Sequence, residues 1–496
     1  MTERSLIKSA GMVTILLVIS RLLGFVRESA IAYRFGTTAE TDAYVMATTV
    51  PLILFLAFND AVKTTFIPVY GEYHRKEEGN TFALTVFFIL GTVLLLLSVL
   101  LVVAAPLVVQ LLAPGFTPEK KEITIVLARI MLPGLLFMGL SGLSSGILHI
   151  KKNFFIPAIT AYPSNVIIII TALFLGVRYG VVGLAWGTMF GFALQFLIQV
   201  PTIAGFGVFK QNKLMWKHPG LKKMALLLPP VVIGSAATEL KTIIDRIFGS
   251  ALPDGDLSAL NFANRVYLLP NGILILALLT VLYPTLVELF AEEKMADFKK
   301  TLRQGIGLII TLVFPMMVGL IVLRVPVVRL LFERGEFTAA ATQSTAYALA
   351  FYSLGLLPLG VMLLFSRAFY ATKDTMTPMF LTFVTMVINT ILNWFLIKPM
   401  AHGGLALGTA ISIYIGAIGL GYLMWKKIGA FGGRRLFATF WKSGVAAAVM
   451  GVVIWFGARF LGGGSFVRQG IEIGVVIGIG AAIYFGLAYL LKVEEL

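Results

Sequence analysis

The chain has 496 residues, of which 58% are hydrophobic and only 13% are charged, and its formal net charge is +16. Soluble domains carry about 25% charged residues, so the composition excludes an ordinary soluble protein. The sequence contains no cysteine, which excludes disulfides, thiolate metal sites and cysteine catalysis.

Apolar segments of about 20 residues follow one another along the chain, and this length suits helices that cross a bilayer. We expect an all-α polytopic membrane protein with about fourteen transmembrane helices. The first segment is too long and too polar for a cleaved signal peptide. The segments lie near residues 9–34, 42–69, 82–112, 123–149, 157–177, 181–205, 225–249, 258–290, 304–323, 340–369, 379–398, 403–425, 437–460 and 469–491.

The positive charges gather in connections that alternate along the chain. With the N-terminus inside, most of them fall on the cytoplasmic side, as the positive-inside rule requires. This placement accounts for the net charge without a nucleic-acid partner and puts both termini in the cytoplasm. The largest cluster, between the sixth and seventh segments, consists of Lys210, Lys213, Lys217, Lys222 and Lys223.

The chain repeats itself at a fixed offset. GLAWGT at 183–188 recurs as GLALGT at 404–409, and Pro157 and Pro378 open corresponding segments 221 positions apart. Upstream, the stretch 111–124 resembles 330–345. We therefore predict two six-helix lobes related by a pseudo-two-fold axis along the membrane normal, with the cargo site between them. The predicted parts are an N-lobe at 1–205, a basic cytoplasmic linker at 206–224, a C-lobe at 225–427 and two further helices at 428–496.

Arginines inside the apolar segments give the first functional clue. Arg21 and Arg27 lie in the first segment, and Arg265 lies in the eighth. A charge at the bilayer centre costs at least about 2.5–3.5 kcal/mol, and arginine stays protonated. Such residues face a wet cavity or a partner, and a cationic cavity suits anionic cargo. The alternative is a structural ion pair of Arg21 or Arg27 with Glu28.

Other polar residues lie beside these arginines. On the first helix, Gly24 falls within the same arc as the arginines and Glu28, and it removes side-chain bulk there. Asp42 suits either a cavity or the start of the second helix. Asp60 and Lys63, spaced i and i+3, either pair with each other or line the cavity next to Asn59. Asn261 precedes Arg265 by one turn, and Pro270 and Gly272 interrupt the helix beyond it.

An amide pair in the eleventh segment suggests a cation site. Asn389 and Asn393 share a helix face, and together with Asp245 and Thr409 they offer oxygen ligands to a hard monovalent cation. From their spacing alone, interhelical hydrogen bonds between amides are the favoured interpretation. Asp245 also has Lys241 one turn before it, which suits a local salt bridge.

Enzyme chemistry finds little support in the sequence. The four histidines are scattered over expected loops and helix ends, so no metal-ligand cluster emerges. No GxxxxGK[ST] motif is present. We therefore expect a protein that is not an enzyme and that has no cofactor, apart from sodium or a proton as a coupling ion.

Several motifs resemble one family. RLLGFVRE at 21–28, TDAY at 41–44, FIPVYGEY at 66–73, LLFERGEFT at 330–338 and SRAFYATKDTMTP at 366–378 are similar to MurJ (MviN) proteins. These are lipid II flippases of the multidrug/oligosaccharidyl-lipid/polysaccharide exporter superfamily. The resemblance implies fourteen helices, with two six-helix lobes around a central cationic cavity. Helices thirteen and fourteen would form a groove for the polyprenyl tail.

The resemblance also implies roles for particular residues. The essential cavity arginines of the family match Arg21, Arg27 and Arg265, and its acidic positions match Glu28 and Asp42. A sodium site known in some members matches five residues of this chain, namely Asp245, Asn389, Asn393, Thr409 and the backbone of Leu405. Asn393, however, stands where the sodium-binding members have a carboxylate.

The second helix departs from the family pattern. Most members carry an arginine four residues after the proline of this helix, where this chain has Phe55. The run that follows reads NDAVKT, with Asp60 in the acidic position. We hypothesise that Lys63, two turns beyond Phe55, replaces the missing cation.

Together these observations predict a monomeric flippase of the bacterial cytoplasmic membrane. It would move lipid II, the undecaprenyl-pyrophosphate-linked peptidoglycan precursor, from the inner to the outer leaflet by alternating access. Its partners would be this glycolipid and membrane lipids. The main alternative is a flippase for another polyprenyl-linked oligosaccharide, of the O-antigen or capsule type. A cation-coupled drug exporter and a membrane-embedded glycosyltransferase are further alternatives.

Overall fold

The computed structural model describes residues 3–76, 78–461 and 465–495, and every element within these ranges is a helix. Inside the helices, the side chains of residues 3–10, 14, 60, 61, 63, 230, 232–238 and 273 lie outside the description. Contacts between Cα atoms divide the chain into unit 1, Met1–Gly255, and unit 2, Asp256–Leu496. Each unit is described by itself.

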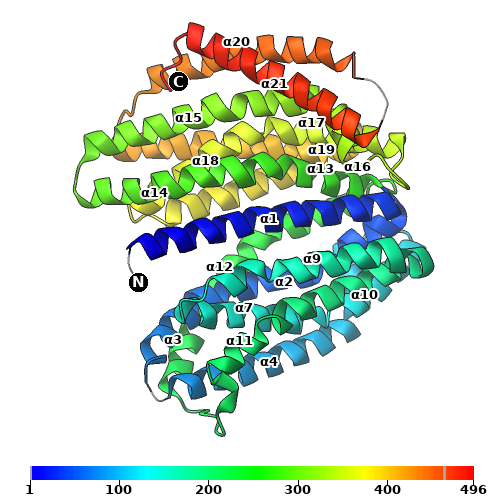
Figure 1. Cartoon of the computed structure of the whole chain (residues 1–496), viewed down its shortest axis with the longest axis vertical. Coiled ribbons are helices and arrows are strands. Elements are labelled where there is room, and N and C mark those ends of the chain that lie inside the picture. Colours follow the sequence, from blue (N-terminus) through cyan, green and yellow to red (C-terminus); the bar gives the residue numbers. More distant parts are fainter. Residues whose placement is uncertain (1–2, 77, 462–464, 496) are drawn as a thin grey trace. The chain divides into compact units, whose positions relative to one another are not determined.

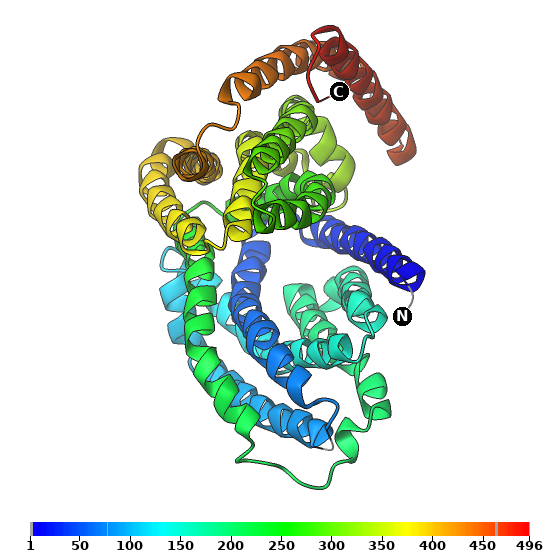
Figure 2. The ribbon, with the colours of Figure 1, turned by 90° about the vertical axis from the view of Figure 1, so that its left-hand side faces the viewer.

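Unit 1 is a bundle in which α2 packs against α6, α7 and α12, while α10 packs against α7 and α9 (Figures 1 and 2). Two π-helical turns, Val62–Phe66 and Thr171–Leu175, and one 3-10 turn, Val208–Lys210, interrupt its helices. The α-helices of unit 1 are α1 (Glu3–Phe35), α2 (Ala39–Ala61), α3 (Ile67–Tyr73), α4 (Gly79–Val103), α5 (Ala105–Leu112), α6 (Pro118–Met131), α7 (Gly134–Ile150), α8 (Phe155–Ile159), α9 (Ala161–Ile170), α10 (Gly176–Leu197), α11 (Val200–Gly205) and α12 (Pro219–Ser250).

Unit 2 is built around α15, which packs against α14, α17, α18 and α20. Helices α20 and α21 pack against each other beside α15 (Figure 1). A π-helical turn, Asn271–Ile275, joins the first two helices of the unit. The α-helices of unit 2 are α13 (Asp256–Pro270), α14 (Leu276–Ala291), α15 (Met295–Val322), α16 (Arg324–Phe332), α17 (Ala339–Leu354), α18 (Leu356–Ala371), α19 (Met376–Ile428), α20 (Gly433–Ala458) and α21 (Phe466–Leu490).

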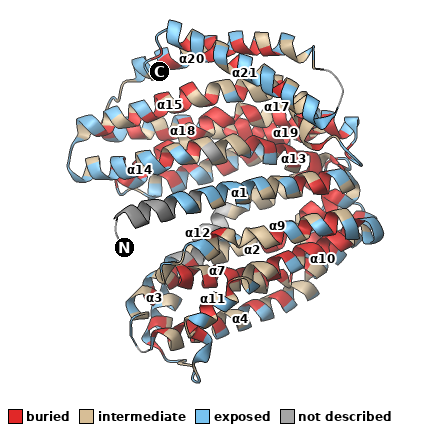
Figure 3. Cartoon of the chain, viewed as in Figure 1, coloured by how far each residue is buried: buried red, intermediate tan, exposed pale blue. Residues whose placement is uncertain are grey.

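Many large apolar side chains of both units are exposed. Figure 3 shows that exposed residues occur along most helices of the chain. Leu96 in α4 is 64% exposed, and Val281 in α14 and Phe395 in α19 are 70% and 68% exposed. A soluble monomer rarely exposes large contiguous apolar patches, whereas hydrocarbon is a good solvent for such side chains. The protein is therefore a multi-pass membrane protein.

By length and hydropathy, seven of the described helices can span a membrane, and nine if each bent pair counts as one span. Two of the seven are much longer than one crossing needs. They are the helical stretch Phe155–Gly205, which contains α8 to α11, and Met376–Ile428, which is α19, and they are 51 and 53 residues long. At 1.5 Å per residue, each is long enough for two crossings. Each of these two helices holds two of the segments predicted from the sequence, and the other predicted segments also fall on helices.

The backbone repeats the offset of 221 that the sequence motifs have. Thr117 caps α6 by accepting a hydrogen bond from the backbone N–H of Lys120, and Thr338 caps α17 by accepting one from Ala341. Each cap begins a bent pair of helices, α6 with α7 at 41° and α17 with α18 at 42°. A threonine cap satisfies one of the helix's unpaired N–H groups, so the repeated residue has a repeated structural role.

The turn after each bent pair repeats as well. Lys152 and Lys373 both have a φ of 60°, and the next residue, Asn153 or Asp374, accepts a hydrogen bond from the N–H three positions later. Although partial burial acts in the opposite direction, hydrogen bonds from Lys427 and from the capped turn lower the pKa of the Asp374 carboxyl. The ion pair with Lys427 spans 2.9 Å.

The third repeated feature is a break inside each of the two long helices. Gly180 has a φ of 56° and Ala401 has a φ of 46°, again 221 positions apart. A positive φ is unfavourable for a residue with a Cβ. The backbone at Ala401 is therefore strained, whereas the matching backbone at Gly180 is not. The internal repeat predicted from sequence motifs thus extends to caps, turns and breaks of the backbone.

The division by contacts differs from the predicted domain boundaries. The prediction places the start of the second lobe at residue 225, whereas α12 packs against α2 and α5 and belongs to unit 1. The predicted boundaries follow the repeat, and the contacts follow packing. The lobe boundaries at 205, 224 and 427 stay predictions.

Close helix packing gives a test of the fold. A Cβ added at Gly187 of α10 would overlap the side chain of Thr171. We expect Gly187→Ala to destabilise the protein by about 1–3 kcal/mol, because overpacking forces neighbouring atoms apart. The measurement is the thermal unfolding midpoint of purified protein in detergent.

The matched control is Gly474→Ala in α21, where an added Cβ meets no heavy atom within 4 Å. Its midpoint should stay the same or rise slightly, since alanine favours a helix interior by about 0.5–1 kcal/mol over glycine. Equal midpoints for the two variants would contradict the packing of α10 against the turn at Thr171.

Candidate functional site

Arg27 of α1 has two polar partners. Its Nη2 lies 2.6 Å from Glu28 Oε1, and its Nη1 donates a hydrogen bond of 3.1 Å to Asn165 Oδ1 of α9. The Arg27 side chain is 25% exposed, whereas that of Glu28 is 7% exposed. A guanidinium has five N–H groups, and these two partners use two of them. They fix the orientation of the guanidinium, while a quarter of the Arg27 side chain is exposed.

Gly24 lies one turn before Glu28, on the α1 face that meets α9. A Cβ at Gly24 would be 4.0 Å from Asn165 Nδ2. An added Cβ would make an ordinary van der Waals contact there, and the role of Gly24 in leaving room for a cargo stays a prediction. Arg21, two turns before Glu28, is exposed on the same helix. The predicted pairing of an arginine with Glu28 is present at Arg27.

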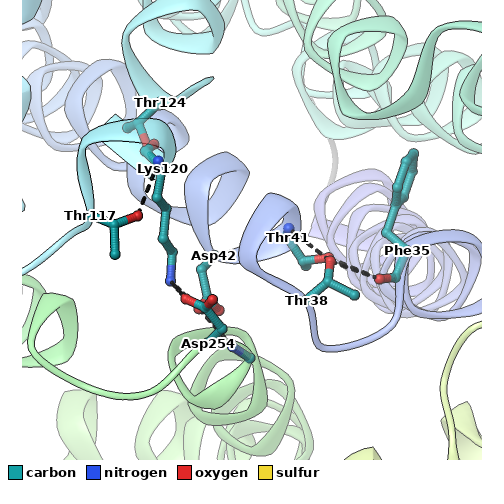
Figure 4. A network of polar contacts seen from close by, with 9 residues as sticks. Phe35, Thr38, Thr41, Asp42, Thr117, Lys120, Thr124 and Asp254 are labelled. Carbon is teal, nitrogen blue, oxygen red and sulfur yellow. Dashed lines mark hydrogen bonds and ion pairs between the residues drawn. The ribbon is translucent and has the colours of Figure 1, made fainter. Parts of the chain in front are cut away.

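A second polar group surrounds Asp42 in the first turn of α2 (Figure 4). Asp42 is fully buried, and its Oδ2 accepts hydrogen bonds from Lys120 Nζ at 2.7 Å and from the Gly255 N–H at 2.8 Å. Lys120 Nζ also donates to Asp254 Oδ1 at 2.8 Å and lies 4.3 Å from the Phe116 ring centroid. We call Asp42, Lys120, Asp254 and the Gly255 N–H the Lys120 network.

The positions of these charges on their helices explain why the network forms. An acid in the first turn of a helix is favoured by the helix dipole, and a cation there is disfavoured. Asp42 suits the start of α2, whereas Lys120 lies in the first turn of α6 and needs its two carboxylates. Removing a partner from a buried ion pair costs about 3–5 kcal/mol. The Lys120 network therefore holds α2, α6 and the segment after α12 together.

The turn from α1 to α2 is also held by hydrogen bonds (Figure 4). Thr38 caps α2 by accepting a bond from the Thr41 N–H, and the Thr41 hydroxyl donates to the Phe35 carbonyl at 3.2 Å. Asp42 follows directly, so the turn that carries Thr38 and Thr41 also sets the position of the buried carboxylate.

The polar end of α2 is described only in part. Asn59 is half-buried and faces α7, where a Cβ at Gly142 would lie 3.4 Å from its Oδ1. Beyond it, the π-helical turn Val62–Phe66 interrupts the helix. The side chains of Asp60 and Lys63 lie outside the described residues, so their pairing and their place in a cavity stay predictions.

In unit 2, Asn261 and Arg265 lie one turn apart on α13, the former half-buried and the latter exposed. The helix interruption predicted at 270–272 is present, because Pro270 ends α13 and the π-helical turn follows it. Arg265 belongs to unit 2, whereas Arg21 and Arg27 belong to unit 1. A cavity shared by the three arginines stays a prediction.

The predicted cation ligands of unit 2 form hydrogen bonds with one another. Asn393 Nδ2 donates to Asn389 Oδ1 at 3.3 Å, and Asn389 Nδ2 donates to Thr409 Oγ1 at 3.4 Å. Gly408 allows this approach, since a Cβ there would lie 2.6 Å from Asn393 Oδ1.

The bond between Asn389 and Thr409 joins the two halves of α19 across the break at Ala401, whereas that between Asn393 and Asn389 lies within the first half. The first of these matches the interhelical hydrogen bond favoured from spacing. Leu405 is buried one turn before Thr409, while Asp245 belongs to unit 1. Oxygen atoms of this kind suit a hard cation, yet here two of them accept hydrogen bonds from the neighbouring amides. Sodium binding stays a prediction. In the described part of the chain, no three His, Asp or Glu side chains form a group that could hold a metal ion.

Sequence reasoning missed Asn165, Lys120 and Asp254. Asn165 stands alone before the apolar run VIIII, and Lys120 lies in a capped helix start that resembles a solvent-exposed loop. Each residue's partner lies more than seventy positions away in the sequence. A single polar residue in an apolar stretch was the available signal, and it does not identify the partner.

An all-helical membrane protein with an internal repeat and compensated charges inside its bundles has the architecture of a secondary transporter. A solved structure shares the fold. The inward-facing form of a multidrug-resistance MATE-family transporter of the MOP superfamily is 15% identical, with a TM-score of 0.70 over 85% of this chain and 99% of that one. That likeness shows the fold.

Residues 31–479 match the family model described as lipid II flippase MurJ, and the chain belongs to the MurJ family. The inward closed conformation of a lipid II flippase MurJ is 28% identical, with a TM-score of 0.81 over 96% of this chain and 98% of that one.

Two curated relatives agree with this assignment. A probable lipid II flippase MurJ from Buchnera aphidicola subsp. Acyrthosiphon pisum is 32% identical over 85% of this chain and 84% of its own length. Another from Vibrio cholerae is 30% identical over 99% and 97%.

The Lys120 network gives a second test. Lys120→Met keeps the apolar part of the side chain and leaves Asp42 buried without its cation, so we expect a loss of about 3–5 kcal/mol in unfolding free energy. Adding Asp42→Asn should recover part of the loss, because an amide oxygen still accepts the Gly255 N–H. The measurement is unfolding of purified protein in detergent.

Lys121→Met is the matched control, since the neighbouring lysine makes an exposed hydrogen bond to the Pro114 carbonyl. Its stability should change by less than about 0.5 kcal/mol. If Lys120→Met and Lys121→Met were equally stable, the buried ion pair would not be holding the helices of unit 1 together.

Proposed function

We propose that this protein translocates lipid II from the inner to the outer leaflet of the bacterial cytoplasmic membrane for cell-wall synthesis. The family supports the cargo, and Arg27 supports the mode of binding. The guanidinium of Arg27 is held by Glu28 and Asn165 inside a membrane-length helix while a quarter of its side chain is exposed. A permanent cation that is already oriented there is suited to a diphosphate.

The chemistry of recognition follows from charge. Arginine forms paired, charge-assisted hydrogen bonds with phosphate oxygens, and it cannot lose its proton inside the membrane. We propose that Arg21, Arg27 and Arg265 bind the diphosphate. Glu28 acts as the resident counter-ion of Arg27 and is displaced when the cargo arrives. Sugars and peptide stay in a wet cavity, and the polyprenyl tail stays in lipid beside α20 and α21.

The transport cycle requires no covalent step. Alternating access exposes the diphosphate site first to the inner and then to the outer leaflet, and the membrane potential or a coupling cation, sodium or a proton, resets it. Both termini lie in the cytoplasm in this proposal, as the placement of the lysines and arginines favours. The working unit is a monomer.

The decisive experiment replaces the resident lipid II flippase of a bacterium with this chain. The readout is the lipid II that becomes accessible at the outer leaflet to an added cleaving enzyme. Wild type should restore exposure, and Arg27→Ala and Arg265→Ala should each reduce it by about 10-fold to 100-fold, since a hydrogen bond to a charged group is worth about 1.5–3 kcal/mol.

Arg178→Ala is the matched control, because this arginine of α10 is exposed and stacks on its neighbour Tyr179. It should leave exposure of lipid II unchanged at equal expression. If well-expressed wild type restores nothing, another polyprenyl-linked oligosaccharide becomes the cargo to test. If the two arginine variants match wild type, the cationic site is refuted.

The same assay tests the role of Lys63. If Lys63 replaces the arginine that most relatives carry at the position of Phe55, then Lys63→Ala should lower lipid II exposure, and Phe55→Arg should rescue it. The reason is that either side chain supplies one cation to the same half of the cavity. A double variant as inactive as Lys63→Ala alone would refute the replacement.

A further inference from the structure

A buried polar cluster in unit 2 lies apart from the residues discussed so far. His402 follows the break at Ala401 and is 7% exposed. Its Nδ1 lies 3.0 Å from Asp256 Oδ2, at the start of α13. Its Nε2 lies 2.9 Å from the Ser344 carbonyl oxygen and 3.2 Å from the Ser344 hydroxyl, both in α17.

Counting protons at this ring gives its charge state. A carbonyl oxygen and an ionised carboxylate only accept hydrogen bonds, and a neutral imidazole has a single N–H. The contact at Nε2 needs a hydrogen on that nitrogen. The contact at Nδ1 is an ion-pair contact and not an aligned hydrogen bond, but a bare Nδ1 lone pair 3.0 Å from a carboxylate oxygen would be repelled. Both contacts are therefore favourable together when both ring nitrogens carry hydrogen, which makes the ring an imidazolium. A proton shifted from Nδ1 to Asp256 would leave the total unchanged, because a coupled pair titrates as one unit. The pair therefore holds one proton.

The surroundings favour the charged form of the ring with an ionised Asp256. The Ser344 hydroxyl donates to Asp256 Oδ1 at 3.2 Å, which turns its oxygen lone pair toward His402 Nε2. From α17, the Tyr347 ring meets the imidazole edge-on, with centroids 5.4 Å apart. Two titratable groups face the ring among the described residues, namely Asp256 from α13 and Tyr347 from α17.

The three residues resemble a Ser–His–Asp triad in composition but not in chemistry. A triad histidine takes the serine proton with a bare Nε2. Here Nε2 faces a carbonyl as a donor, and the serine hydroxyl donates to the carboxylate. The arrangement binds a proton and does not activate a nucleophile.

We propose that His402 and Asp256 form a proton-binding site and that the proton is a coupling ion of the transport cycle. The bound proton ties the first turn of α13 to α17 and to the break in α19. When the proton leaves to water, a neutral imidazole remains beside a carboxylate, and one of its two nitrogens then faces an acceptor without a hydrogen. That contact is lost, and α13, which carries Arg265, is released. The coupling role of the proton rests on the proposed function, whereas the proton site itself does not.

The first experiment observes the proton directly. The full chain, labelled with 15N-histidine and reconstituted in lipid nanodiscs, contains four histidines, and His402→Gln identifies the signals of His402. We expect both ring nitrogens of His402 to be protonated near neutral pH, and Asp256→Asn to convert the ring to a single neutral tautomer. His149→Gln, which removes a histidine elsewhere in the chain, should leave these signals unchanged. A single neutral tautomer of His402 in wild type from about pH 5 to about pH 7, beside an Asp256 carboxyl that infrared difference spectra against Asp256→Asn show to be ionised, would overturn the site, because the pair would then hold no proton.

The second experiment measures coupling. Lipid II translocation in proteoliposomes should change several-fold when a pH gradient is imposed, and this response should vanish in His402→Gln but persist in His149→Gln. An equal response of wild type and His402→Gln would overturn the coupling role. If wild type translocates no lipid II at all, the proposed function fails, while the labelled histidine spectra still decide whether the proton site exists.

Discussion

Every charge placed inside an apolar bundle needs a partner within reach, and this requirement organises the interior of the protein. Moving an unpaired ion into a low-dielectric medium costs many kcal/mol, so the buried charges occur in compensated groups. Arg27 has Glu28 and Asn165, Lys120 has Asp42 and Asp254, and His402 has Asp256. Each group joins helices distant in sequence, so charge compensation also determines which helices pack together.

The backbone of the two halves repeats more faithfully than their polar contacts. Thr188 and Thr409 occupy matching places in the repeated GLAWGT and GLALGT motifs. Thr188 binds the hydroxyl of Tyr44 at 2.8 Å, whereas Thr409 accepts from the amide of Asn389. The repeat supplies matching helix caps and breaks, and each unit then builds its own polar site. Two halves with the same backbone and different polar contacts suit a cargo that is itself asymmetric, because each half can contact a different part of it.

Much of this fold can be read from the sequence, because membrane helices are specified by local properties. Apolar length predicts the helices. The offset of 221 predicted two related lobes, and the repeated caps at Thr117 and Thr338 agree with that repeat. The site was harder, because periodicity assigns a residue to a helix face and leaves its partner open. Arg27 was recognisable as a charge inside an apolar segment that needs a partner or a wet cavity, and Asp42 as a residue of either a cavity or a helix start. Lys120 resembled a loop lysine, since its burial depends on carboxylates contributed by α2 and by the segment after α12.

The Lys120 network also bears on how the chain is assembled in the membrane. Asp42 and Lys120 emerge from the ribosome early, but Asp254 and the Gly255 amide follow only after α12 has been made. Until then the pair of Asp42 and Lys120 lacks two of the hydrogen bonds of the finished network. The network can be complete only after α12 and the segment that follows it have been made, at the border between the two units.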